Sequence, residues 1–203
     1  MKKLILTIAL ALATFTAAHA QFGVVGGWTL SKTPSTPADV FNVNNFSMWH
    51  AGIAYKFEIG PFFNIQPALV YHAKATGASE ENSDYYYVRS NYVELDLGLQ
   101  LGVDLLAFRP FVLVEPFVGY DVSSITKVDS LVKDELARAK NKFEGGVGVG
   151  GGIELLNHIQ ITAQWFANFG KLYDGDKITT PAWSDLTHLN NYQGFKLTLG
   201  FFF

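Results

Sequence analysis

Hydrophobic and polar side chains alternate with a period of two residues along much of the chain. In residues 92–103 every odd position is apolar, whereas the even positions include Glu94, Asp96 and Gln100. Side chains at i and i+2 share one face of a β-strand, so this pattern predicts a strand with one apolar and one polar face. The same alternation recurs in residues 48–59, 63–74, 111–122, 143–155, 159–169 and 194–203.

Together with residues 22–31, whose alternation is less regular, these segments predict eight strands. Long polar connections lie near residues 32–46, 75–87, 123–142 and 170–191, and short turns lie at 60–61, 106–109 and 156–158. This alternation of long and short connections puts every long loop at one end of an antiparallel barrel and both termini at the other. The sequence therefore predicts an all-β fold, an eight-stranded antiparallel up-and-down transmembrane β-barrel formed by one domain, residues 21–203.

Residues 1–20 are expected to be a cleaved signal peptide. Lys2 and Lys3 precede an apolar stretch, and Ala18-His19-Ala20 places small residues where a signal peptidase cuts. The apolar stretch is shorter than the ~20 residues that a transmembrane helix needs. No cysteine follows the cleavage site, so a lipid anchor is not expected there.

Composition narrows the classes of function. The chain has no cysteine, which excludes disulfides, a zinc finger, a thiol nucleophile and an iron–sulfur site. Charged residues make up 16% of the chain, against about 25% in an ordinary soluble domain. The formal net charge is −3, so no nucleic-acid partner is expected. Neither does any motif imply a cofactor.

The alternation alone leaves open which face of each strand points outward. A secreted lipocalin-like barrel would enclose the leucines, whereas a membrane barrel would turn them to lipid. Glycines on the polar face of residues 143–155 favour the membrane barrel, because they leave room in a narrow lumen. Aromatic residues near the long-loop end of each strand favour it as well, because tyrosine and tryptophan prefer the membrane interface. The expected interface aromatics are Trp28, Trp49, Tyr92, Trp165 and Tyr192, with Tyr71, Tyr120 and Phe143.

In a membrane barrel the charged side chains are expected to point inward. A cation that faces lipid costs ~2–4 kcal/mol at the midplane of the bilayer. An eight-stranded barrel is just wide enough inside for side chains to fill, so a salt-bridged plug is expected, with a narrow ion path as the alternative and a general diffusion pore unsupported. The expected interior network comprises Lys56, Glu58, Glu94, Asp96, Glu115, Glu144, Glu154 and Lys196.

Several short segments resemble the PorT-like outer-membrane β-barrel family of Bacteroidota. They are residues 22–27 (FGVVGG), 65–71 (IQPALVY), 91–95 (NYVEL), 109–111 (RPF) and 164–170 (QWFANFG). The chain departs from the family at Asp96 and Gln164, where Pro and Arg are usual. The resemblance implies a place in the outer membrane and a part in protein secretion or envelope assembly. Phe203 is similar to the terminal aromatic signature that the barrel-assembly machinery recognises.

An enzyme that modifies lipid A is one alternative function. It would need a serine, a histidine and an acid at the outer rim, and the candidates are Ser47, His50 and either Asp84 or Asp185. Ser47 and His50 are three residues apart, which places them on opposite faces of a strand. The sequence therefore offers no credible catalytic set, and we do not expect an enzyme.

A binding or assembly role carried by the loops is the remaining class. Tyr85-Tyr86-Tyr87 and Pro181-Ala182-Trp183 put aromatic side chains into polar connections, and exposed aromatics are good anchors for partners. Asp174-Gly175-Asp176 lacks the further ligands of a calcium loop and is more typical of a turn. The sequence thus favours a structural, adhesive or complex-forming protein, surrounded by outer-membrane lipid, with other envelope proteins as partners of its loops.

Overall fold

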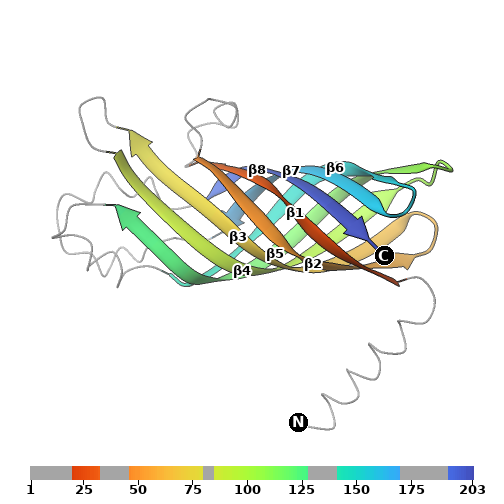
Figure 1. Ribbon diagram of the computed structural model, residues 1–203, viewed down its shortest axis with the longest axis horizontal. Coiled ribbons are helices and arrows are strands. Elements are labelled where there is room, and N and C mark those ends of the chain that lie inside the picture. Colours follow the sequence, from red (N-terminus) through yellow and green to blue (C-terminus); the bar gives the residue numbers. More distant parts are fainter. Residues whose placement is uncertain (1–19, 33–45, 80–84, 128–140, 170–191) are drawn as a thin grey trace, which may run out of the picture.

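Eight antiparallel strands close into a barrel. The computed structural model describes residues 20–32, 46–79, 85–127, 141–169 and 192–203. Each strand pairs with its neighbours in the chain, and β1 pairs with β8, so the fold expected from the alternation is confirmed (Figure 1). In this part of the chain no helix has the length and apolar character needed to cross a membrane. The strands are β1 Ala20–Lys32, β2 Phe46–Ile59, β3 Phe63–Ser79, β4 Tyr85–Gly102, β5 Phe108–Lys127, β6 Phe143–Leu155, β7 Ile159–Phe169 and β8 Gln193–Phe202.

The short turns, the start of β1 and the end of β8 lie at one end of the barrel. Gly60 takes a φ of 75° in the first turn, a left-handed conformation that costs glycine little because it has no Cβ. At the same end the Phe203 N–H donates a hydrogen bond of 2.8 Å to the Phe22 carbonyl oxygen. We call this the short-turn end, and the opposite end the long-loop end.

Three strands are longer at the long-loop end than the alternation predicts. Pairing continues outward to Ser79↔Tyr85 between β3 and β4, and to Tyr87↔Lys127 between β4 and β5. Figure 1 shows these strands projecting on the left beyond the rest of the barrel. The Tyr85-Tyr86-Tyr87 backbone, expected in a loop, therefore belongs to β4, which fits the strand preference of tyrosine.

The two faces of the barrel wall have opposite polarity. Along β4, Leu95 and Leu101 are exposed, whereas Glu94, Asp96 and Gln100 are almost fully buried. Around the barrel most charged and amide side chains are likewise buried inside, and most large aliphatic side chains are exposed outside, whereas aromatic side chains occur on both faces. A soluble lipocalin-like barrel would show the reverse, so the apolar surface is the outer one.

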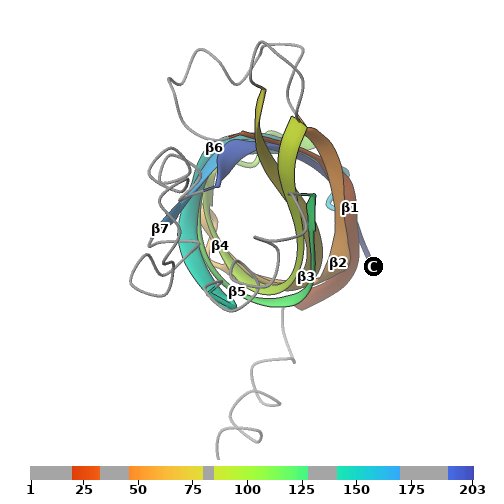
Figure 2. The ribbon, with the colours of Figure 1, turned by 90° about the vertical axis from the view of Figure 1, so that its left-hand side faces the viewer.

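The outer end of β3 lies inside the hairpin formed by β1 and β2. Pairing between β2 and β3 stops at His50↔His72, although β1 and β2 remain paired for four more residues of β2. The Ser31 hydroxyl, on the inward face of β1, donates to the Ala75 carbonyl oxygen at 2.7 Å and accepts from the Ala75 N–H at 3.0 Å. Ala73 and Ala75 have the parity of the outer face, yet both are fully buried. We call residues 73–75 the tucked segment; it narrows the mouth that Figure 2 views end-on.

A lysine-centred polar interior as the candidate functional site

Polar side chains from all eight strands fill the lumen, and three buried lysines organise them. Each ammonium lies within 4 Å of two carboxylates, so every lysine ties together strands that do not pair with one another. Because a buried charge without a partner is strongly unfavourable, this arrangement keeps the charges compensated in a space that water cannot freely enter. The three sets are Lys74 with Glu94 and Glu144, Lys196 with Asp96 and Glu115, and Lys56 with Glu154 and Glu58.

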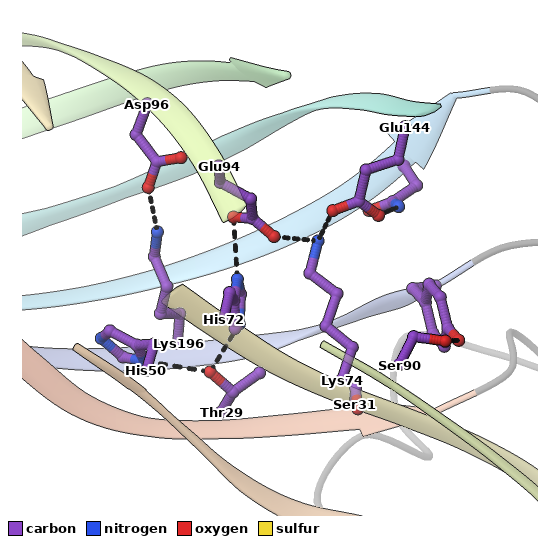
Figure 3. A network of polar contacts seen from close by, with 12 residues as sticks. Thr29, Ser31, His50, His72, Lys74, Ser90, Glu94, Asp96, Glu144 and Lys196 are labelled. Atoms are coloured by element: carbon purple, nitrogen blue, oxygen red, sulfur yellow. Dashed lines mark hydrogen bonds and ion pairs between the residues drawn. The ribbon is translucent and has the colours of Figure 1, made fainter. Parts of the chain in front are cut away.

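The set nearest the long-loop end is centred on Lys74 of β3. Its Nζ lies 2.8 Å from Glu94 Oε1 of β4 and 2.8 Å from Glu144 Oε1 of β6 (Figure 3). The second oxygen of Glu144 accepts a hydrogen bond from the Asn168 side-chain amide of β7. The Glu144 carboxylate is thereby fixed in orientation toward the ammonium.

Aromatic rings surround the same ammonium. Lys74 Nζ lies 4.5 Å from the centre of the Phe117 ring, 5.2 Å from that of Phe166 and 5.3 Å from that of Tyr92. A cation within about 6 Å of a ring face is attracted by its negative quadrupole, most strongly where water is excluded. The Lys74 side chain is fully buried, so the rings and carboxylates replace the whole hydration shell of the ammonium.

A chain of histidine and threonine side chains continues from this set across the lumen. His72 Nδ1 lies 2.9 Å from Glu94 Oε2, and the other ring nitrogen of His72 lies 2.8 Å from Thr29 Oγ1. Thr29 Oγ1 is also 3.0 Å from His50 Nδ1, and His50 Nε2 is 2.9 Å from Thr198 Oγ1. Figure 3 shows Thr29 between the two imidazoles. One buried hydroxyl thus links two histidines from neighbouring strands.

The central set is built on Lys196 of β8. Its Nζ lies 2.5 Å from Glu115 Oε1 and 3.1 Å from Asp96 Oδ2, and Gln164 Nε2 donates to the same Glu115 oxygen at 2.7 Å. The cavity beside these residues measures about 20 Å³, which is room for about one water molecule.

The set nearest the short-turn end combines Lys56 with an arginine. Lys56 Nζ lies 2.5 Å from Glu154 Oε1 and 3.6 Å from Glu58, whose side chain is 36% exposed and therefore lies at the rim. Arg109 Nη1 donates to Gln100 Oε1 at 3.2 Å. A basin of about 370 Å³ opens here, lined by Glu58, Glu154, Arg109 and turn residues.

The expected interface aromatics divide into two groups. Trp28, Trp49 and Trp165 are exposed on the outer surface. Tyr92 and Tyr192, in contrast, point into the lumen, where their rings meet edge to face at 6.2 Å. The expectation that these two tyrosines lie at the membrane interface is therefore wrong. Their positions in the strands are even-numbered, like those of the buried polar residues, whereas the outward-facing leucines occupy odd positions. The Tyr192 hydroxyl is 2.8 Å from the Ser90 hydroxyl.

Of the residues proposed for a lipid-modifying site, the structure describes the side chain of His50 alone. His50 is buried inside the barrel instead of lying at the rim. Several other expectations fall outside the described residues. They concern the Ser47 side chain, Asp84, Asp185, the Asp174-Gly175-Asp176 and Pro181-Ala182-Trp183 segments and most of the expected signal peptide. Among the residues that are described, no three histidines and acids are grouped so as to hold a metal ion.

Several interior residues escaped the sequence analysis. Phe117 and Phe166 stand over the Lys74 ammonium, yet neither is in the expected network. The same is true of Thr29, which is hydrogen-bonded to His72, and of Arg109, which donates to Gln100. The signal that would have found them is again parity, because Phe117 has the same parity as Glu115 and Phe166 the same as Gln164. Phe203, the expected assembly signal, is exposed at the short-turn end, with its ring 6.3 Å from that of Phe22.

Comparison with known proteins agrees with this architecture. Residues 16–174 match the model of a family described as outer membrane protein beta-barrel domain. No curated protein matches the chain. The match spans most of the chain and includes all of β1 to β7, so the chain belongs to the outer membrane protein beta-barrel domain family.

Proposed function

We propose that this outer-membrane barrel is a non-conducting membrane anchor that forms complexes with other envelope components through its long-loop end. The observation that carries the proposal is the filled lumen: the central cavity of about 20 Å³ does not accommodate a hydrated ion. A structural or complex-forming role needs neither a pore nor a catalytic set. It is also the role that the PorT-like resemblance of residues 65–71 and 91–95 implies.

The position of the extended strands supports the same proposal. Long loops of outer-membrane barrels face the outside of the cell, and β3, β4 and β5 extend at that end. An ordered sheet that stands beyond the barrel offers a partner a surface with a fixed shape. The proposed anchor would thus present this sheet while the plug keeps the membrane sealed.

Two measurements test the proposal. Purified protein in planar bilayers is expected to give no discrete conductance, whereas steps that shift on Glu115→Gln would contradict a sealed anchor and favour the narrow ion path. For the partner role, the wild type is compared on native gels of gently solubilised outer membranes with a variant in which a two-residue turn replaces residues 76–88. The wild type is expected to migrate as a larger species than the variant. A size difference no greater than the mass of the deleted residues would contradict complex formation through this sheet.

A further inference from the structure

We propose that the outer half of the lumen is an ammonium-binding site that the chain fills with its own Lys74, and that an external primary alkylammonium group takes the place of Lys74 when the tucked segment moves out. This inference goes beyond the anchor role and does not depend on it. It rests on the composition of the Lys74 environment and on the unusual path of β3.

The environment of Lys74 has the composition of an ammonium receptor. Two carboxylates contact the nitrogen at 2.8 Å each, and the Phe117, Phe166 and Tyr92 rings stand over it at 4.5–5.3 Å. Aromatic cages of this kind recognise ammonium groups in other binding sites. Two carboxylates add the hydrogen-bond acceptors that a primary ammonium, with three N–H donors, requires.

Lys196 offers an internal comparison. It too is buried between two carboxylates, Asp96 and Glu115, but among the described contacts no aromatic ring stands over its ammonium. A salt bridge that only holds strands together therefore does not need the cage. The three rings around Lys74 are the feature that points to recognition of an ammonium group.

None of the carboxylates and rings that surround the ammonium belongs to β3, the strand that carries Lys74. Tyr92 and Glu94 belong to β4, Phe117 to β5, Glu144 to β6 and Phe166 to β7. Each of these strands pairs with the next, with a register shift between Asn91 and Tyr92 of β4. Lys74 alone comes from β3. Removing the ammonium would therefore leave the carboxylates and rings in position.

The tucked segment begins where the pairing of β3 with β2 ends. It is tied to β1 by the two hydrogen bonds between Ser31 and Ala75. Extending the β2–β3 register outward from His50↔His72 would place Ala75 opposite Ser47. The segment is paired with β4 on one edge and has no partner on β2 at the other. In our proposal it pairs with residues 46–49 of β2, and this movement draws Lys74 away from the receptor.

We expect Lys74 to leave the receptor only when an external ammonium group replaces it, so that the receptor is not left empty. Withdrawing Lys74 leaves Glu94 and Glu144 buried without a cation, and an uncompensated buried charge is strongly destabilising. An incoming ammonium group removes that penalty. The ligand class is therefore a primary alkylammonium with an unbranched chain, as in the Lys74 side chain that it replaces.

Chemical rescue tests the receptor. Lys74→Ala removes three carbons and the nitrogen, which together have the size of propylammonium. The temperature at which the folded, fast-migrating gel band disappears is expected to fall in this variant and to rise again with propylammonium, but not with propanol or with sodium at equal ionic strength. Lys196→Ala is the matched control and is expected to show little rescue. Absent rescue of Lys74→Ala, or equal rescue of both variants, would overturn the proposed receptor.

If Lys74→Ala does not fold alone, the same comparison is made on the yield of folded band when the variant refolds with each compound. An increase specific to propylammonium supports the receptor, and equal yields contradict it.

A crosslink tests the exchange in a chain that keeps Lys74. The protein has no cysteine, so the pair Ser47→Cys and Ala75→Cys reports on this movement. The two positions face each other when the tucked segment takes the β2 register, and the disulfide is expected to form fastest then. Propylammonium is expected to accelerate this crosslink several-fold, whereas propanol is not. An unchanged rate would overturn the exchange with an external ligand, even if the rescue of Lys74→Ala succeeds.

Discussion

Lys196 on β8 and Glu115 on β5 meet across the centre of the barrel, with 2.5 Å between the ammonium nitrogen and a carboxylate oxygen. The two strands are not neighbours in the sheet, so this ion pair braces the wall from inside. Asp96 on β4 shares the same ammonium. The interior side chains therefore connect distant strands of the barrel through ion pairs and help to hold the fold together.

Lys196→Met is expected to destabilise the barrel by about 3–5 kcal/mol, because two buried carboxylates lose their cation. Urea unfolding in detergent micelles or lipid vesicles, followed by tryptophan fluorescence, measures the change. The neutral triple variant, Lys196→Met with Asp96→Asn and Glu115→Gln, serves as the control and should recover much of the loss. A triple variant as unstable as the single one would argue against charge compensation as the cause.

Thr29→Val is expected to cost about 1–3 kcal/mol, because the change keeps the shape of the side chain but leaves His50 and His72 each without one hydrogen-bond partner. Thr198→Val, which affects only His50, should cost less. The same unfolding measurement compares them. Equal stability of wild type and Thr29→Val would mean that the hydroxyl does not couple the two histidines.

Gly150→Ala is expected to destabilise the barrel by about 1–3 kcal/mol through overpacking. A Cβ at this position would overlap the Ala163 carbonyl oxygen and lie 2.6 Å from the Gln164 Cβ, inside the lumen. Gly145→Ala on the same strand is the matched control, since its nearest neighbour would be 3.7 Å away. The thermal midpoint of the folded gel band should fall for Gly150→Ala and stay near wild type for Gly145→Ala.

Leu97→Arg is expected to cost about 2–4 kcal/mol in a bilayer, because Leu97 faces outward near the middle of the barrel-forming part of β4. Leu156→Arg, in an exposed turn at the short-turn end, should be nearly neutral. Unfolding from lipid vesicles tests the pair. Similar small effects at both positions would show that the outer surface near Leu97 does not contact hydrocarbon.

Strand parity predicted the fold and the inward direction of most charged residues, because a side chain's face in a strand depends only on odd or even position. Glu94 and Asp96 could be placed inside from sequence for this reason. Tyr92 lies in the lumen and not at the membrane interface, because its even-numbered position in the strand, and not its closeness to the strand end, determines the face on which it lies. The sequence does not predict the outer ends of β3, β4 and β5, because residues 75–79, 85–91 and 123–127 show no regular alternation of apolar and polar side chains.

The tucked segment could not be read from alternation at all. Its position depends on Ser31 and Ala75, which lie on strands that are not adjacent in the sheet. The sequence of β3 does contain one related feature. The positions of outward parity after Tyr71 hold the small residues Ala73 and Ala75, which allow β3 to pack closely beneath the β1–β2 hairpin. Packing between distant segments depends on which side chains fit together in three dimensions, and the pattern of residues in a single sequence does not predict it.

The pairing of β1 with β8 determines the order in which the barrel can be completed. Gly23 pairs with Phe202, so the beginning of the described chain must stay unpaired along one edge until its last residues are available. Contacts between such distant residues form slowly, because a long loop must close first. Lys196 arrives with the same final strand, so the central carboxylates can obtain their cation only as the wall closes. Closing the cylinder and supplying the cation of its central carboxylates thus depend on the same strand, β8.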